Sequence, residues 1–344
     1  MSDSDAASMR EILLKLCRRE DLTREESRAA FLRIMSGDAP DAQIGGLLIG
    51  LAAKGTTVDE LVGAATVMRE KAVTVSCEGN DVILDTCGTG GDVRGTFNIS
   101  TAAAVIAAAG GIKVVKHGNR SATSKAGSAD VLEKLGVRLN LSPEQLSRCV
   151  REANICFAFA RDHHPAMKYV AGARSALAVP TIFNMLGPLA NPAGARHQVL
   201  GVFAPELTAR FAQVLRELGS ERAWVVHAED GLDELSTLGP TRIAEWKGGA
   251  VTTWTLDPAE LGLPYARLSD LAISDVDEAA DVLLRIFDGE KGPRRDIALL
   301  NAAAALVVAG ASHRMDDGLR RAADLVDSGK ARETLDLLVQ CSQA

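Results

Sequence analysis

The residues that can do chemistry gather first in residues 81–101, which read DVILDTCGTGGDVRGTFNIST. The apolar residues 82–84 are typical of a buried strand end, and glycines follow at 88, 90, 91 and 95. Asn98 and Ser100, both cap-forming residue types, then precede the helix-prone run AAAVIAAAGG. Backbone N–H groups and a helix dipole can hold an anion at such a joint, and glycine lets it approach closely. We therefore interpret this stretch as an anion cradle.

Two common nucleotide motifs do not fit this stretch. A dinucleotide fingerprint needs glycine three residues after its second glycine, and from Gly90 that position is Val93. A Walker loop needs Gly-Lys-Ser/Thr at its end, which does not occur here. Taken alone, the pattern also fits an ordinary strand–turn–helix joint.

A second cluster of the same character follows at residues 113–136, which read KVVKHGNRSATSKAGSADVLEKLG. An apolar strand end again leads into glycines and then into a helix over 128–135. The mixture of cations and small hydroxyls suits several phosphate groups; it comprises Lys116, Asn119, Arg120, Ser121, Thr123, Ser124, Lys125 and Ser128. Parallel strands bring their carboxyl ends to one edge of a sheet, where α/β proteins bind ligands. Two such clusters together predict a phosphorylated ligand, whereas one alone would suit a solvated loop.

Acidic residues follow a later strand, 222–227, in the sequence AEDGLDELS. Asp230, Asp233 and Glu234 would repel a phosphate unless a divalent cation lay between them. Mg²⁺ suits this position because it takes a few carboxylates and keeps water and phosphate oxygens as its other ligands. Without the two glycine clusters, a plain polar turn would explain these residues equally well.

Other chemistry-bearing residues give weaker indications. His163 and His164 are adjacent, so they cannot share one metal in the i, i+4 manner, and no Cys or Glu stands nearby at zinc-ligand spacing. Arg174, ten residues later, reads by itself as a surface charge on a helix.

The elements that position these residues divide the chain into two parts. Residues 1–76 predict helices, with capping boxes at Thr23/Glu26 and Thr57/Glu60. Residues 77–344 predict strands alternating with helices, a hairpin over 241–256 and a helical C-terminal region. We expect an α/β fold with a separate N-terminal helical domain. Small residues such as Gly45, Gly46 and Gly50 allow close helix contact within that domain or across a dimer.

Composition excludes several classes of function. The 344 residues are 47% hydrophobic, enough for a large core, and the net charge of −7 gives no basic surface for nucleic acid. No leader pattern and no apolar run long enough to span a bilayer is present. Six cysteines are scattered without a C-x-x-C pair, which is typical of reduced thiols in a cytoplasmic protein.

The motifs together resemble anthranilate phosphoribosyltransferases over about residues 9–340. The resemblance rests on DTCGTGGD with TFNIST, KHGNR with GSADVLEKLG, HPAMK with TIFN and LGPLANP, and DGLDE, in the same order and spacing. It implies transfer of the phosphoribosyl group from phosphoribosyl diphosphate to the amine of anthranilate, a step toward tryptophan. It also implies a nucleoside-phosphorylase-like phosphoribosyltransferase fold, with a mostly parallel central sheet flanked by helices. Helices near 165–195 would return to the N-terminal domain, through which homodimers form.

The resemblance also assigns site residues. Those implied to surround phosphoribosyl diphosphate are Gly88, Gly91, Asp92, Thr96, Asn98, Ile99, Ser100, Thr101, Lys116, His117, Gly118, Asn119, Arg120, Ser121, Ala122, Thr123, Ser124 and Ser128. Those implied to line the anthranilate path are Gly88, Asn119, His164 and Arg174, with Arg174 facing the carboxylate. Ser100, Asp233 and Glu234 are implied to hold Mg²⁺, two ions per subunit.

The chemistry of this reaction agrees with the residues. Mg²⁺ and Lys116 can stabilise the charge that develops on the leaving diphosphate. An aromatic amine is a weak base and needs little deprotonation before attack, so no strong general base is required. His117 is the one ionisable catalytic candidate near both clusters, and a structural hydrogen bond would explain it equally.

Three positions depart from the family pattern. Val93 stands where glycine commonly follows GTGGD, Gly172-Ala173 replace Pro-Val before Arg174, and Pro180 stands where an arginine usually precedes TIFN. These departures concern the rim of the anthranilate channel more than the phosphate sites.

Two alternative functions are weighed against this interpretation. A pyrimidine nucleoside phosphorylase would carry Ser-Thr-Gly-Gly in its lysine loop in place of KHGNR. A nucleic-acid-binding relative would need a basic groove and would have lost the metal carboxylates, against the net charge of −7 and Asp233-Glu234.

Overall fold

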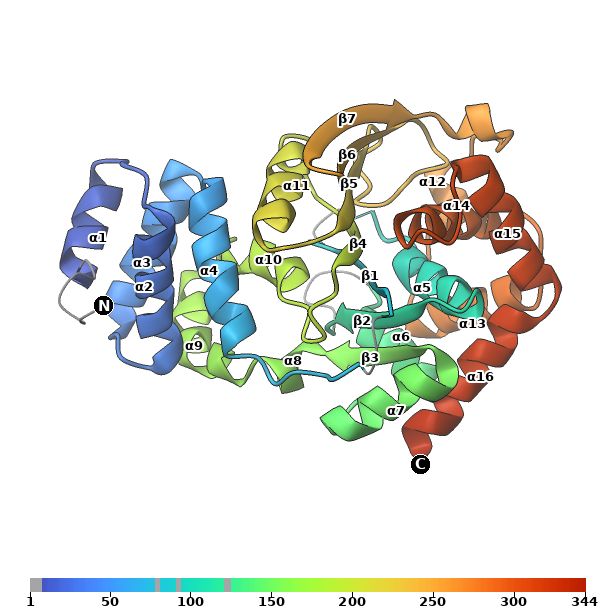
Figure 1. Cartoon of the computed structure of the whole chain (residues 1–344), viewed down its shortest axis with the longest axis horizontal. Helices are drawn as coiled ribbons and strands as arrows, with labels where there is room; N and C mark the ends of the chain where they lie inside the picture. The colour runs from blue at the N-terminus through green and yellow to red at the C-terminus, as the bar shows by residue number, and fades with distance from the viewer. Residues whose placement is uncertain (1–7, 78–80, 91–93, 121–124) are drawn as a thin grey trace.

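The computed structural model describes residues 8–77, 81–90, 94–120 and 125–344. It begins with four helices, α1 (Met9–Cys17), α2 (Arg24–Ser36), α3 (Asp41–Lys54) and α4 (Val58–Glu70). The predicted capping boxes at the starts of α2 and α4 are confirmed, and α1 has a third, formed by Ser8 and Glu11. Figure 1 shows these helices as a separate blue group beside the rest of the chain.

A seven-stranded sheet forms the centre of the larger part, in the order β3-β2-β1-β4-β5-β6-β7. The first five strands in chain order are parallel, and β6 and β7 form the predicted antiparallel hairpin. The bounds are β1 (Ile83–Gly88), β2 (Lys113–Gly118), β3 (Ile155–Phe159), β4 (His197–Gly201), β5 (Arg222–Ala228), β6 (Thr241–Lys247) and β7 (Ala250–Leu256). Successive strands run outward from β1 in both directions, so β1 and β4 form the switch point at which open α/β sheets bind ligands.

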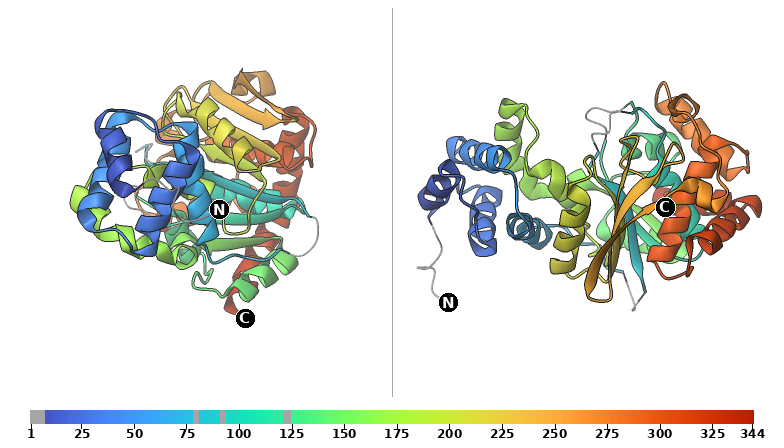
Figure 2. Two further views of the ribbon diagram at one scale, coloured as in Figure 1. Left: turned by 60° about the vertical axis from the view of Figure 1, so that its left-hand side comes forward. Right: turned by 90° about the horizontal axis from the view of Figure 1, so that it is seen from above.

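Alternating side chains of the sheet enter two different hydrophobic cores. Trp224 and Val226 of β5 face the core that contains α5 (Ile99–Ala109) and α14 (Pro293–Val308), whereas Ala223 and Val225 face the core that contains α11 (Leu207–Glu217). The second core continues into the N-terminal helices. Figure 2 (right) shows the twisted sheet with helices on both faces.

The remaining helices surround this frame. They are α6 (Ser128–Lys134), α7 (Pro143–Ala153), α8 (Ala160–His163), α9 (Lys168–Leu177), α10 (Phe183–Leu186), α12 (Leu268–Leu271), α13 (Val276–Phe287), α15 (Met315–Asp327) and α16 (Lys330–Gln343), with short 3₁₀ turns η1 (Pro165–Met167), η2 (Gly187–Leu189) and η3 (Pro258–Leu261). The C-terminal helices cover one face of the sheet (Figure 1).

The chain returns to the N-terminal helices after β3. Helix α9 packs against α2 and α3, and α10 packs against α4. The Phe183 ring meets the Phe31 ring edge-on, with 5.7 Å between centroids. Part of the core of the helical N-terminal domain is therefore formed by residues far along the chain. Among the described residues, no helix is long and apolar enough to cross a membrane.

Candidate active site

The turn after β5 packs over the carboxyl ends of β1 and β4. Asp233 Oδ2 accepts a hydrogen bond from the Gly90 backbone N–H at 3.0 Å. A Cβ on Gly88 would lie 2.7 Å from the same carboxylate oxygen, and a Cβ on Gly201 would lie 1.5 Å from the Asp233 carbonyl oxygen. Glycine is required at position 201 because the backbone of the acidic turn lies against it, and a side chain at position 88 would displace the Asp233 carboxylate.

Glu234 and Lys116 meet at the first turn of α5. Glu234 Oε1 accepts a hydrogen bond from the Ser100 N–H at 3.2 Å. Lys116 Nζ donates to the Ser100 Oγ at 3.1 Å and to the Thr86 carbonyl oxygen at 2.6 Å. The ammonium is buried, and this burial lowers the pKa of Lys116, opposed by the charge of Asp85. The structure thus brings together predicted residues of both glycine clusters and of the acidic turn.

Asn98 stands at the N-cap position of α5, but its side chain does not cap the helix. Its Nδ2 donates instead to the Ala126 carbonyl oxygen at 3.1 Å, which ties the first cluster to the second. The prediction of a side-chain cap was wrong because this tertiary contact takes the amide. The buried Asn98 Oδ1 and Thr101 Oγ1 have no hydrogen-bond partner among the described residues. Both oxygens can accept a hydrogen bond from a ligand or from water.

The other predicted residues of the first cluster form its framework. Thr96 makes an isolated antiparallel bridge with Ala272, and the side chain of Ile99 is buried in the core. Gly91, Asp92 and Val93 lie outside the described residues.

The second cluster is held close to α6. A Cβ on Gly118 would lie 2.5 Å from the Ser128 Oγ, and that hydroxyl is 3.4 Å from the Asn119 carbonyl oxygen, to which it donates. Arg120 forms ion pairs with Asp130 and Glu133 at 2.7 and 2.8 Å, which raise its pKa further. Arg120 therefore points to α6 here. The predicted residues Ser121, Ala122, Thr123 and Ser124 lie outside the described residues.

His117 and His164 form a buried pair on the other side of β2. Their Nε2 atoms are 3.2 Å apart, and His117 Nδ1 lies 3.2 Å from the Gly187 carbonyl oxygen. Burial, helped by the neighbouring histidines, lowers the pKa of His117 to about 3 and that of His164 to about 4. Both imidazoles are therefore neutral at pH 7.

Sequence reasoning missed two contributors to this pair. The Asp85 Oδ1 accepts a hydrogen bond from the His117 backbone N–H at 3.2 Å, and burial raises the pKa of this carboxyl. A lone acidic residue inside an apolar strand was the signal for Asp85. The Gly187 carbonyl carried no signal, since it comes from a segment 70 residues away in sequence.

Arg174 is not the surface charge that its local sequence suggests. Its guanidinium lies over the Phe183 ring, 5.2 Å from the centroid, and burial lowers its pKa. Among the described residues, no carboxylate lies within ion-pair distance of it. Such a half-buried cation can receive a carboxylate from a ligand. Of the departures nearby, Gly172 has open space around its Cα and Pro180 is exposed.

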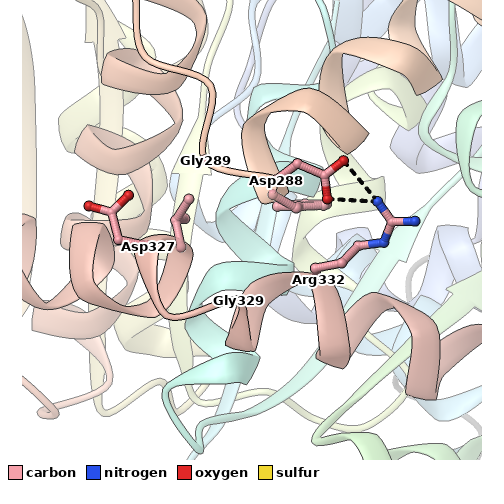
Figure 3. Close-up of a pocket in the computed structure, with 7 residues that line it drawn as sticks. Asp288, Gly289, Asp327, Gly329 and Arg332 are labelled. Carbon is pink, nitrogen blue, oxygen red and sulfur yellow. Dashed lines mark hydrogen bonds and ion pairs between the residues drawn. The ribbon is translucent and has the colours of Figure 1, made fainter.

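A separate pocket of about 460 Å³ lies among α13, α15 and α16 (Figure 3). Its charged residues bind each other or the surrounding protein: Arg332 pairs with Asp288 at 2.8 Å, and Asp327 pairs with the buried Arg295 at 2.6 Å. It contains none of the residues predicted for the site, so the strand ends remain the candidate.

The donors at the strand ends suit a magnesium ion. Asp233, Glu234 and the Ser100 hydroxyl all offer oxygen, the donor that Mg²⁺ prefers. Within the described part of the chain, no group of three or more His, Cys, Asp or Glu side chains is arranged to hold a metal ion. A cation here would complete its shell with water or ligand oxygens, as Mg²⁺ usually does beside phosphates.

The comparisons with known proteins agree on one family. Residues 80–332 match the glycosyl transferase family, a/b domain, and residues 10–72 match the glycosyl transferase family, helical bundle domain. Anthranilate phosphoribosyltransferase of Methylobacterium nodulans is 49% identical over 98% of this chain and 99% of its own length. The Rhodospirillum rubrum enzyme of the same name is 52% identical over 91% of this chain and 90% of its own length.

Solved structures give the same result. The anthranilate phosphoribosyltransferase of Thermus thermophilus superposes with a TM-score of 0.91 at 41% identity, covering 96% of this chain and 99% of that one. The Saccharomyces cerevisiae enzyme, solved in complex with PRPP and Mg, gives 0.89 at 27% identity over 97% and 98%. With two family matches and near full-length relatives at about half identity, this chain belongs to the anthranilate phosphoribosyltransferase family.

Proposed function

We propose that this chain is an Mg²⁺-dependent anthranilate phosphoribosyltransferase of tryptophan biosynthesis. It transfers the 5-phosphoribosyl group of phosphoribosyl diphosphate to the amine of anthranilate, giving N-(5-phosphoribosyl)anthranilate and diphosphate. One observation carries the proposal: Lys116, Ser100, Asp233 and Glu234 meet at the carboxyl ends of neighbouring strands. The yeast relative solved with PRPP and Mg supports it.

Phosphoribosyl diphosphate binds along the two glycine clusters in this proposal. The N–H groups at the start of α5 and the ammonium of Lys116 face its anionic oxygens, where buried donors act more strongly than in water. If Arg120 binds a phosphate group of this ligand, it must first give up its ion pairs with α6.

Asp233, Glu234 and Ser100 would hold the metal, with two ions per subunit. Bound Mg²⁺ would neutralise charge on the diphosphate as it leaves. The two carboxylates are fixed by the N–H groups of Gly90 and Ser100, so the metal would meet ligands that are already oriented.

Anthranilate approaches from the side of the helical domain, past Gly88, Asn119 and His164. Its carboxylate pairs with Arg174, which places the amine toward the ribose. A related observation is the yeast relative solved with 4-fluoroanthranilate, 26% identical to this chain.

The reaction breaks the bond between ribose C1 and the diphosphate oxygen and forms a bond from C1 to the amine nitrogen, which then loses one proton. Lys116 stabilises the leaving oxygens, and the fixed site supplies orientation. His117 could accept the proton only through Nε2, the atom that His164 contacts. A catalytic role for His117 therefore requires His164 to move, and water is the simpler acceptor.

The assembly and location follow as further proposals. Leu14, Leu32 and Ile49 are large apolar side chains exposed on α1, α2 and α3, which supports a homodimer through the helical domain. All six cysteines are free, which suits a reducing cytoplasm. We place the domain boundary at 76/77, with helices from about 165–195 joining the first domain.

Anthranilate fluorescence tests the function directly. Purified protein is mixed with anthranilate, phosphoribosyl diphosphate and Mg²⁺, and each component is omitted in turn. Loss of fluorescence that requires all of them supports the transferase. No loss with folded protein refutes it, and pyrimidine nucleosides with phosphate, and then single-stranded DNA, would be tested next.

A further inference from the structure

Arg69, in the last turn of α4, is a cation held without an anion. Its Nε donates to the Leu189 carbonyl oxygen at 2.7 Å, and its Nη1 donates to the Leu218 carbonyl oxygen at 2.9 Å. No acidic side chain of the described residues forms an ion pair with it. Burial lowers the pKa of the guanidinium to about 10, so it is still charged at pH 7.

Removing part of a charge from water and pairing it with backbone oxygens carries a cost, so the position of this half-buried guanidinium calls for a reason. The planar fork of arginine can reach two carbonyls at once, which an ammonium on a single flexible stem does less well. The two carbonyls belong to different segments, since Leu189 ends η2 and Leu218 is the C-cap of α11. Arg69 thus links the helical domain to two segments beside the sheet.

The segment that contains Leu189 is the one that orients the histidine pair. Three successive carbonyls are held by three side chains: Gly187 by His117, Pro188 by the Gln198 amide at 2.6 Å, and Leu189 by Arg69. A shift of residues 187–189 would therefore move the partner of His117 and, through the contact between the two Nε2 atoms, disturb His164 as well.

The residues that follow Arg69 also form hydrogen bonds with the segments next to the histidine pair. The Val73 N–H donates to the His163 carbonyl oxygen at 2.9 Å, and the His163 Nδ1 lies 2.6 Å from the Val73 carbonyl oxygen. The Val75 N–H donates to the Pro192 carbonyl oxygen at 3.1 Å. Residues on both sides of the histidine pair are thus tied to the connection between α4 and β1.

We propose that Arg69 is a positioning residue: by holding the Leu189 carbonyl it fixes residues 187–189. Through the Gly187–His117 contact it thereby fixes the tautomer and orientation of His117 and of its partner His164. It touches no substrate itself. Its effect on kinetics rests on the proposed function, in which His164 lines the anthranilate path. Its effect on the geometry of the two histidines is independent of that function.

The test uses Arg69→Met, which keeps volume without donors, and Arg69→Lys, which keeps the charge but loses the fork. Arg28→Met is the matched control, since Arg28 forms an exposed ion pair with Glu70, the residue next to Arg69. The first readout is the ¹⁵N spectrum of the ring nitrogens, assigned with His117→Gln and His164→Gln. We expect the His117 and His164 signals to move in both Arg69 variants and to stay in Arg28→Met.

The second readout is the split between Michaelis constants. We expect the KM for anthranilate to rise roughly tenfold or more in Arg69→Met, with the KM for phosphoribosyl diphosphate nearly unchanged and Arg69→Lys between the two. A merely structural role would shift both constants or neither. If Arg69→Met does not fold, the same two measurements on Arg69→Lys test the proposal.

Unchanged histidine signals in folded Arg69→Lys overturn the inference, as does an equal rise of both constants. If the wild-type protein does not consume anthranilate, the proposed function fails and the spectra alone decide the role of Arg69.

Discussion

The Nε2 atoms of His117 and His164 lie 3.2 Å apart, and this contact assigns the protons of both rings. The Gly187 carbonyl can only accept, so His117 carries its proton on Nδ1 and leaves Nε2 bare. His164 must then donate from its own Nε2. Both rings are buried and neutral, and each uses its Nε2 atom in this one hydrogen bond.

The first prediction concerns stability at low pH. The native pKa values of about 3 and about 4 lie below the ordinary histidine value of 6.5. Between these values the two histidines are protonated in the unfolded chain but neutral in the native protein. The free energy of unfolding should therefore fall as pH drops from about 6.5 toward 4, by about 2 kcal/mol for each histidine at pH 5. Urea unfolding at pH 7 and pH 5 measures this.

His164→Gln isolates the effect, because glutamine can donate to His117 but does not titrate. The variant should lose less stability than the wild type between pH 7 and pH 5. The raised pKa of Asp85 has the opposite slope and is common to both proteins. Equal losses in the two proteins would contradict the prediction.

The second prediction concerns Arg174. Arg174→Ala removes the cation over Phe183 and should raise the KM for anthranilate roughly ten- to a hundredfold, the value of a charge-assisted hydrogen bond. The KM for phosphoribosyl diphosphate should change little. Arg161→Ala, at an exposed arginine of α8, is the control. Equal effects of Arg174→Ala on both constants would reject the carboxylate role.

The third prediction concerns the metal. Asp233→Asn keeps an oxygen for the Gly90 N–H but loses the charge, so the Mg²⁺ concentration for half-maximal turnover should rise at least about tenfold. Glu229→Gln changes an exposed carboxylate in the same turn and should leave the Mg²⁺ requirement as it is. The metal assignment would not survive an unaltered Mg²⁺ titration of Asp233→Asn.

The fourth prediction concerns Lys116. Lys116→Met fills the same buried space without the ammonium and should weaken phosphoribosyl diphosphate binding roughly ten- to a hundredfold by calorimetry. Lys113→Met is the control on the same strand, since Lys113 bonds the Asn154 side chain at 2.6 Å at the opposite end. Wild-type affinity in Lys116→Met would remove this residue from the site.

The fifth prediction concerns Gly201. Because a Cβ there would lie 1.5 Å from the Asp233 carbonyl oxygen, Gly201→Ala must displace the acidic turn. Turnover should fall about a hundredfold, with a stability cost of about 1–3 kcal/mol. Gly239→Ala, where no heavy atom lies within 4 Å of the new Cβ, should change neither. Full activity of Gly201→Ala would show that the turn adapts.

Local patterns predicted much of the frame. The apolar runs located the strands, the predicted helical C-terminal region contains α13 and α15, and the two predicted capping boxes begin α2 and α4. These features succeed because each depends on a few consecutive residues: hydrophobic period, caps and glycines. The meeting of Lys116 with Ser100 could be predicted because parallel strands end together.

The contacts that tune the site could not be predicted in this way. Asn98 donates a hydrogen bond to the Ala126 carbonyl, His117 contacts the Gly187 carbonyl, and the Arg174 guanidinium lies over the Phe183 ring. Each contact depends on the tertiary fold, which local sequence patterns do not specify. Every residue has a backbone carbonyl, so the residue type does not show which carbonyl will accept a hydrogen bond in the site. Arg69 illustrates the limit, since its sequence surroundings resemble any helix end.

The return of α9 to the N-terminal helices has a consequence for synthesis on the ribosome. Helices α1–α4 are complete at residue 70, whereas α9 begins at residue 168. At translation rates of about 5–20 residues per second, the faces of α2 and α3 that α9 covers wait roughly 5 to 20 seconds for it. During that interval Phe31 lacks the Phe183 ring that it meets in the finished fold. A nascent chain that stalls before α9 therefore presents an open apolar surface to the chaperones around the ribosome exit.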